Sequence, residues 1–134
     1  MRTGNLIRYK LSEESCKKYA LNRSFRDVVD SRGHVWDFSL FNPAMLLDVS
    51  FLSRVHKVKL ECCRSVIDVS PLAGVYELTL SDMSEVTDVS ALKSVHILTL
   101  RWMNGVRDVS ALSSVPNLKI LYCRHLKNVF RRTV

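Results

Sequence analysis

Apolar residues return along most of this chain at a fixed interval of 20 residues. Each unit opens with the triplet Asp-Val-Ser and continues with the same frame of leucines and valines. The triplets begin at Asp48, Asp68, Asp88 and Asp108. A constant period is typical of a stacked repeat protein, because one unit of this length cannot bury its apolar face without neighbours. The pattern therefore predicts a solenoid of equal coils.

Each regular coil is expected to contain one short strand, because apolar and polar residues alternate there with a period of two. The alternating segments are Val58-Lys-Leu60, Leu78-Thr-Leu80, Leu98-Thr-Leu100 and Leu118-Lys-Ile120. Strands that recur at a constant offset within a coil must run parallel. The sequence therefore predicts a parallel sheet along one side of the solenoid.

The opposite side of each coil is expected to be a short turn. The serine of the triplet precedes Pro71 in one unit and alanine in others, which predicts the N-cap of a single helical or 3-10 turn. The aspartates of the triplets are expected to accept backbone amides of their own or the next turn. Their regular spacing favours a scaffold role over a catalytic one.

The first part of the chain predicts a helical cap over the open end of the array. Ser12, followed by two glutamates, is typical of a helix start, and a second helix is expected from Asn22 or Ser24. Apolar residues at helical spacing should face the core; they are Cys16, Tyr19, Ala20, Phe25, Val28 and Val29. A first, irregular coil is expected over about 28–47, with its strand at Trp36-Asp-Phe38-Ser-Leu40.

These observations predict one domain over 1–134, with a helical cap (1–31), repeats (32–127) and a basic tail (128–134). Hydrophobic residues make up 47% and charged residues 25% of the chain, which suits an ordinary soluble core. No apolar run approaches the ~20 residues of a membrane span, so we expect no membrane association. The start of the chain has no apolar stretch typical of a secretory signal, which favours an intracellular location.

Positive charge gathers at the two ends of the chain. The net charge is +7, to which residues 1–32 contribute +4, residues 33–118 contribute −2 and residues 119–134 contribute +5. No Gly-rich phosphate loop, nucleophile with a defined base or separate carboxylate pair is present, so we expect no enzyme and no cofactor.

The four cysteines are explained by packing. Cys63 and Cys123 occupy a column that Met83 and Met103 fill in the other units, so sulfur there is interchangeable with a soft apolar side chain. The segment Cys123-Arg-His125 is the nearest approach to a pair of metal ligands, and no second pair accompanies it. We expect no metal site and no disulfide framework.

The frame Leu-x-x-Leu-x-Leu-x-x-Cys-x-x-Val-x-Asp-Val-Ser-x-Leu resembles a leucine-rich repeat, closely over about 48–126 and loosely over 19–47. The segments VIDVSPLAGVYELTL and VTDVSALKSVHILTL resemble leucine-rich repeat proteins of marseillevirus-like giant DNA viruses of amoebae, and of some protists. Two departures are notable. The usual asparagine is Cys or Met here, and no family-type C-terminal cap follows Leu126.

This resemblance implies an α/β fold, a right-handed solenoid with a parallel concave sheet of about five short strands. The convex side would consist of 3-10 turns and loops. The usual role of the family is protein recognition. A viral protein of this kind would act in the host cytoplasm or nucleus, or be packaged in the virion.

Side chains between the inward apolar positions of each strand should face outward on the concave side. Trp102 beside Tyr122, with Arg101 and Leu121 adjacent, has the most interface-like composition, because aromatic and arginine residues dominate binding hot spots. The alternative is that these rings only cover the edge of the sheet. We expect the column that contains His56, Tyr76 and His96 to lie flat over neighbouring coils. The predicted partner-binding residues are Lys57, Lys59, Arg101, Trp102, Lys119 and Tyr122.

The leading functional hypothesis is a non-catalytic protein-interaction module, as a viral structural protein or a factor that engages a host protein. A first alternative is binding of nucleic acid or another polyanion, set against a solvated basic tail. The residues for it are Lys119, Arg124, Lys127, Arg131 and Arg132. A further alternative is an adaptor that recruits other machinery through its N-terminal helices. Self-association at the C-terminal end would use Val129 and Phe130.

Overall fold

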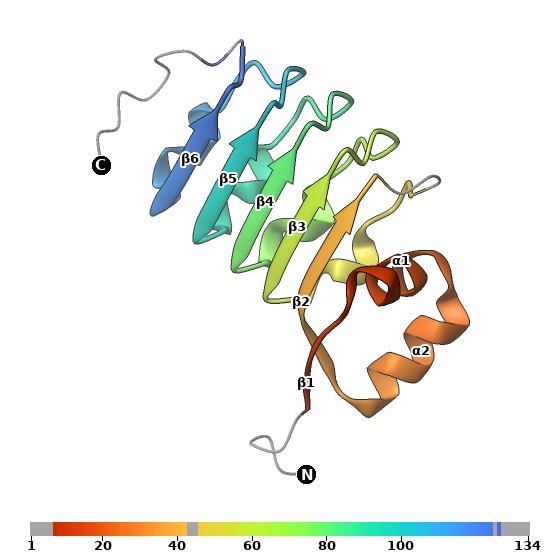
Figure 1. The fold of residues 1–134 in the computed structure, drawn as a ribbon. Coiled ribbons are helices and arrows are strands. Elements are labelled where there is room, and N and C mark those ends of the chain that lie inside the picture. The colour runs from red at the N-terminus through yellow and green to blue at the C-terminus, as the bar shows by residue number, and fades with distance from the viewer. Residues whose placement is uncertain (1–6, 43–45, 125, 127–134) are drawn as a thin grey trace.

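The computed structural model describes residues 7–42, 46–124 and 126. In these residues six parallel strands form one sheet in chain order (Figure 1). The strands are β1 (Arg8–Lys10), β2 (His34–Phe41), β3 (Lys57–Glu61), β4 (Glu77–Ser81), β5 (Ile97–Arg101) and β6 (Asn117–Leu121). The helices α1 (Glu13–Leu21) and α2 (Arg23–Arg32) lie between β1 and β2 in the chain and pack on β2. The fold is therefore an α/β, solenoid-like array.

Equivalent residues of successive coils lie side by side, as equal coil lengths require. Leu60 pairs in register with Leu80, and Leu80 pairs with Leu100. The same offset relates β2 to β3 and β5 to β6. Neighbouring strands lie ~4.8 Å apart, so each repeat position becomes a column across the sheet. The predicted columns are confirmed.

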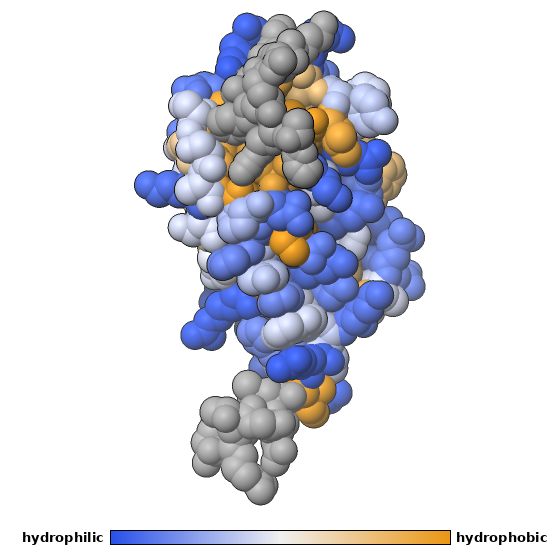
Figure 2. All heavy atoms as spheres, turned by 90° about the vertical axis from the view of Figure 1, so that its left-hand side faces the viewer, coloured by the Kyte–Doolittle hydropathy of each residue, from blue (hydrophilic) through white to orange (hydrophobic). Residues whose placement is uncertain are grey.

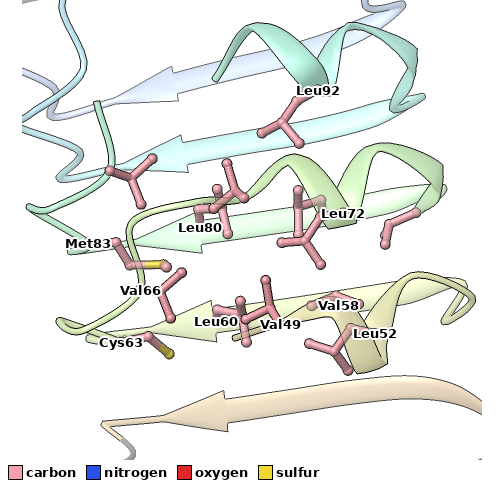
Figure 3. Close-up of a cluster of buried hydrophobic side chains, with 14 of the residues drawn as sticks. Val49, Leu52, Val58, Leu60, Cys63, Val66, Leu72, Leu80, Met83 and Leu92 are labelled. Atoms are coloured by element: carbon pink, nitrogen blue, oxygen red, sulfur yellow. The ribbon is translucent and has the colours of Figure 1, made fainter. Parts of the chain in front are cut away.

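The core lies between the sheet and a row of short 3-10 helices, which Figure 3 shows for the first coils. Val58 from β3 lies next to Leu52 from the turn behind it, and both side chains are buried. The 3-10 helices are η2 (Ser50–Leu52), η3 (Ser70–Gly74), η4 (Ser90–Ser94) and η5 (Ser110–Ser114). Burying a leucine stabilises the fold by about 1.5–3 kcal/mol. Stability is therefore shared along the stack.

The sulfur column is inside the molecule, as the sequence predicts. Cys63, Met83 and Met103 are at most 1% exposed, and Cys123 is 6% exposed. Cys63 and Met83 occupy the same place at the turn after successive strands (Figure 3). These cysteines therefore serve as packing residues.

Each aspartate of the triplets caps its own turn. Asp68 Oδ1 accepts the backbone amide of Ser70 at 2.9 Å, and Asp48, Asp88 and Asp108 do the same in their coils. The prediction that serine is the N-cap is wrong. Ser70 is the first residue of its 3-10 helix, and the cap position belongs to Val69, which makes no side-chain cap bond. The aspartate takes this role because its carboxylate reaches the amide two residues ahead.

The two predicted helix starts are confirmed. Ser12 Oγ accepts from the backbone amide of Ser15 at 3.2 Å, and Asn22 Oδ1 accepts from that of Phe25 at 3.0 Å. Of the apolar residues expected to face the core, Cys16, Tyr19, Ala20 and Val29 are buried and Phe25 packs on the core. Val28 is 51% exposed, so that prediction is wrong. Val28 also lies within α2, so the first coil does not begin there.

The sheet has one strand more than the sequence predicts. β1 pairs in parallel with β2, and the backbone amide of His34 donates to Ile7 O at 2.7 Å. Gly33 allows this approach, because a β-carbon there would lie 2.5 Å from the same oxygen. The segment Arg8-Tyr-Lys10 was missed because it is short and has a single apolar side chain. The N-terminal cap therefore contains a strand, β1, in addition to its two helices, and this strand extends the sheet.

Across the described part of the chain, none of the helices combines the length and the apolar character that a bilayer crossing demands.

Candidate interaction surface

The six predicted partner-binding residues divide into two groups on the exposed face of the sheet. Lys57 and Lys59 lie on β3, whereas Arg101 and Lys119 lie on β5 and β6. Trp102 and Tyr122 directly follow these last two strands. The two groups are separated by β4, a gap of ~10 Å at the spacing of a sheet.

The β3 lysines have partners within the protein. Lys57 Nζ lies 3.8 Å from Glu77 Oε2, and Lys59 Nζ lies 3.8 Å from Glu61 Oε1. Such exposed pairs add little stability, about 0–1 kcal/mol, but each lysine already faces a carboxylate. These two residues are therefore less available to a partner than their sequence position suggests.

Trp102 and Tyr122 form a stacked pair at the ends of β5 and β6. Their ring centroids are 4.7 Å apart and their planes differ by 17°. The Trp102 side chain is 46% exposed and the Tyr122 side chain 63% exposed. The adjacent Leu121 is 40% exposed. The two stacked rings and Leu121 therefore form a partly exposed apolar area on the surface.

The backbone at these two positions is left-handed, with φ of 54° at Trp102 and 58° at Tyr122. The same position of earlier coils holds Asn42, Cys62 and Asp82, also with positive φ. Asparagine and aspartate tolerate this region, but a bulky aromatic residue there costs roughly 1–2 kcal/mol. Stacking offsets part of that cost, about 0.5–1.5 kcal/mol. The fold itself therefore does not explain why aromatic residues stand at these two positions.

The cations near this pair have no acidic partner in the described part of the chain. Within 7–42, 46–124 and 126, Arg101, Lys119 and Arg124 make no ion pair. Arg101 Nε is buried and lacks a hydrogen-bond acceptor in the same residues. Buried polar groups are nearly always satisfied, so this donor is an exception that needs an explanation.

A second aromatic column crosses the sheet at the N-terminal ends of the strands, whereas Trp102 and Tyr122 lie at the C-terminal ends. Trp36 stacks on His56 at 4.1 Å, His56 on Tyr76 at 4.8 Å, and Tyr76 on His96 at 4.6 Å between ring centroids. The prediction that these rings lie flat over neighbouring coils is confirmed. Arg8 adds a guanidinium 4.2 Å from the Trp36 centroid, a contact that the sequence did not indicate. Because the ring faces cover one another, this column holds successive coils together.

A small cavity of about 150 Å³ separates the helical cap from the first coil. Its lining includes Tyr19, Asp30, His34 and Arg54. The Tyr19 hydroxyl donates to Asp30, and burial with this hydrogen bond raises the Tyr19 pKa. Ligand pockets usually measure about 300–1,000 Å³, so this cavity is too small for most substrates.

The cysteines are poor candidates for nucleophiles. Burial raises the pKa of the Cys63 thiol to about 12. The Cys62 thiol donates to Asp82 at 3.5 Å, and partial burial together with this bond raises its pKa as well. A reactive cysteine needs the opposite shift, toward the thiolate.

The C-terminal end of the array carries apolar surface. Leu118 and Ile120 on β6 are partly buried, whereas Leu98 and Leu100 on β5 are fully buried. Figure 2 shows apolar side chains gathered at this end of the molecule. The predicted contacts of Val129 and Phe130, and the cations Lys127, Arg131 and Arg132, lie outside the described residues.

In comparisons with known proteins, the chain matches no family model, no curated protein and no solved structure. Trp102 and Tyr122 form one surface with the residues around them, named here the aromatic–basic patch, which consists of Arg101, Trp102, Lys119, Leu121, Tyr122 and Arg124.

Proposed function

We propose that this protein is a non-catalytic interaction module that binds another protein through the aromatic–basic patch. In this proposal the solenoid is a short leucine-rich repeat of right-handed coils, and its exposed sheet is the concave face. The observation that carries the proposal is the stacked pair of Trp102 and Tyr122, which is half-exposed and held on a left-handed backbone.

Two features of the pair favour protein binding. Tryptophan, tyrosine and arginine are the residue types that most often dominate binding energy at protein interfaces. In addition, aromatic side chains at positions that suit asparagine weaken the fold, so their presence requires a benefit elsewhere. Binding of a partner supplies such a benefit.

The size of the sheet limits what can dock on it. Six strands span ~24 Å across the sheet, and strands of five residues are ~17 Å long, which gives a face of about 400 Å². A stable protein–protein interface buries about 800 Å² on each partner. The face therefore suits a short segment of a partner better than the surface of a folded domain.

The test compares the double variant Trp102→Asn/Tyr122→Asn with Cys62→Asn. Both introduce asparagine at the same left-handed position of the repeat, but Cys62 lies two coils before Trp102. Proteins captured by the wild type from the cells that make it would be identified, purified and titrated against all three forms.

We expect the double variant to bind at least tenfold more weakly, with Cys62→Asn close to wild type. Thermal unfolding of each form verifies that the fold is retained. Equal affinity of the double variant and the wild type for every purified partner would remove the patch from consideration.

A further inference from the structure

The exposed face of the sheet is divided by charge. On β3 and β4, Lys57 is paired with Glu77 and Lys59 with Glu61. Just beyond β3, Arg64 Nη2 lies 2.9 Å from Asp82 Oδ2. These cations are neutralised within the protein. The aromatic–basic patch on β5 and β6 is different.

In the patch, none of the positive charges makes an ion pair within the part of the chain that is described, although Asp82 of the preceding coil lies next to Arg101 and is paired with Arg64. Arg101 and Lys119 extend from the strands, and Arg124 follows Tyr122 by two residues. The outward positions of β5 and β6 hold Ile97, Thr99, Asn117 and Leu121 besides these cations, so no carboxylate is contributed by either strand. The patch therefore has an unbalanced positive charge next to exposed rings.

Of these cations, Arg101 gives the most information about the chemistry of a ligand. Its Nε is buried and has no acceptor among the described residues, and the planar guanidinium suits a carboxylate that accepts two parallel hydrogen bonds. An oxygen ligand from outside could reach the terminal Nη groups of Arg101, whereas the buried Nε would meet it only if the side chain turned outward. Arg101 is adjacent to Trp102 in the chain, so such a ligand would sit beside the stacked rings.

The acids of neighbouring coils restrict the length of an anionic ligand. Glu61, Glu77 and Asp82 lie on or just beyond β3 and β4. A long polyanion that crossed the sheet would approach these carboxylates, and like charges oppose that path. The face thus favours an anion confined to the last two coils.

We propose that the ligand of the aromatic–basic patch is a short acidic segment of a partner protein. A carboxylate of that segment binds Arg101, and an aromatic or proline side chain packs on the rings of Trp102 and Tyr122. This inference rests on the proposed function and specifies the partner chemistry for the same surface.

The experiment selects phage-displayed random peptides of about 12 residues on the full chain at moderate salt. We expect enriched peptides to combine Asp or Glu with a neighbouring aromatic residue or proline. Affinities of the synthesised peptides are then measured for Arg101→Gln, Lys119→Gln and the control Lys57→Gln. Lys57 lies on the same face, but it already has Glu77 as a partner.

Arg101→Gln should weaken peptide binding about tenfold, and Lys119→Gln about threefold, while Lys57→Gln changes it less than twofold. Raising the salt concentration should weaken binding to the wild type more than to Arg101→Gln, because charge–charge attraction is screened.

Enrichment of neutral or basic peptides that still require Trp102 and Tyr122 would overturn the acidic ligand but leave the interaction module standing. Absence of any peptide that depends on these two rings would overturn both. A labelled single-stranded oligothymidylate of about 15 nucleotides serves as a further probe. Tighter binding of this probe than of the best acidic peptide, with loss in Arg101→Gln, would assign the patch to nucleic acid and overturn the proposal.

Discussion

The guanidinium of Arg8 lies 4.2 Å from the centroid of the Trp36 ring. Arg8 belongs to β1, and Trp36 begins the column of stacked rings that continues through His56, Tyr76 and His96. The cap and the repeats are therefore joined by side-chain stacking as well as by the pairing of β1 with β2.

Replacing Arg8 with alanine is expected to weaken this junction. A cation over an indole face contributes about 0.5–1 kcal/mol at an exposed site, so Arg8→Ala should lower the free energy of unfolding by that amount. Urea denaturation measures the change. Lys10→Ala on the same strand removes a like charge without a described ring contact and should have a smaller effect. Equal effects of the two variants would mean that the contact adds no stability.

The leucine ladder predicts a gradient of stability along the array. Leu80 is fully buried, and β4 has a neighbouring strand on each side, so Leu80→Ala should cost about 2–5 kcal/mol. Ile120 on β6 is only partly buried, so Ile120→Ala should cost clearly less. Chemical denaturation of both variants compares them. A larger loss for Ile120→Ala would show that the last coil is packed as tightly as the central ones.

The triplet aspartates predict acid sensitivity. Hydrogen bonds from the serine backbone amides and hydroxyls lower the pKa values of Asp68, Asp88 and Asp108 below the usual 3.8. A carboxyl whose pKa is depressed by folding stabilises the fold above the unfolded pKa, and this contribution is lost as pH falls through the folded value. Stability from these groups should therefore be complete above about pH 5 and decrease below about pH 4.

Thermal unfolding between about pH 2 and pH 6 tests this pH dependence. The triple variant Asp68→Asn/Asp88→Asn/Asp108→Asn keeps an oxygen acceptor for each amide but removes the titrating group. Its melting temperature should fall less steeply with acid than that of the wild type. The same dependence of melting temperature on pH in both proteins would show that these aspartates do not cause the loss of stability in acid.

The aromatic pair predicts an unusual stability result. Trp102→Asn/Tyr122→Asn removes the stack, worth about 0.5–1.5 kcal/mol, but it also relieves left-handed strain of roughly 1–2 kcal/mol at each position. The opposing effects should leave the melting temperature close to that of the wild type or above it. Differential scanning calorimetry provides the measurement. A loss of more than about 3 kcal/mol would identify the rings as part of the core.

Much of the arrangement could be read from the period alone. Equal coil lengths require equivalent residues to stack, so the columns of Leu60, Leu80 and Leu100 and of the sulfur residues followed directly from their spacing. The alternation within each strand then separated the core from the exposed face. Both inferences depend only on local geometry that repeats.

The repeat pattern predicts the aromatic–basic patch only in part. Trp102 and Tyr122 stood out by residue type, and the recurrence of Asn42 and Asp82 at their position could have indicated a left-handed backbone. The sequence does not indicate the pairing of Lys57 and Lys59 with acids, and it predicts both as binding cations alongside Arg101. Side-chain directions and distances decide such pairs, and repeat spacing does not contain them.

By itself, the sequence determined which residues share a column and which repeat positions face the core, because a constant period leaves one register for the stack. The tertiary structure alone decided that β1 joins the sheet, that Arg8 covers Trp36 and that Arg101 Nε finds no acceptor among the described residues. These features arise where the repeat begins or where side chains of different coils compete for partners. Their free energies depend on contacts across space, which no pattern along the chain records.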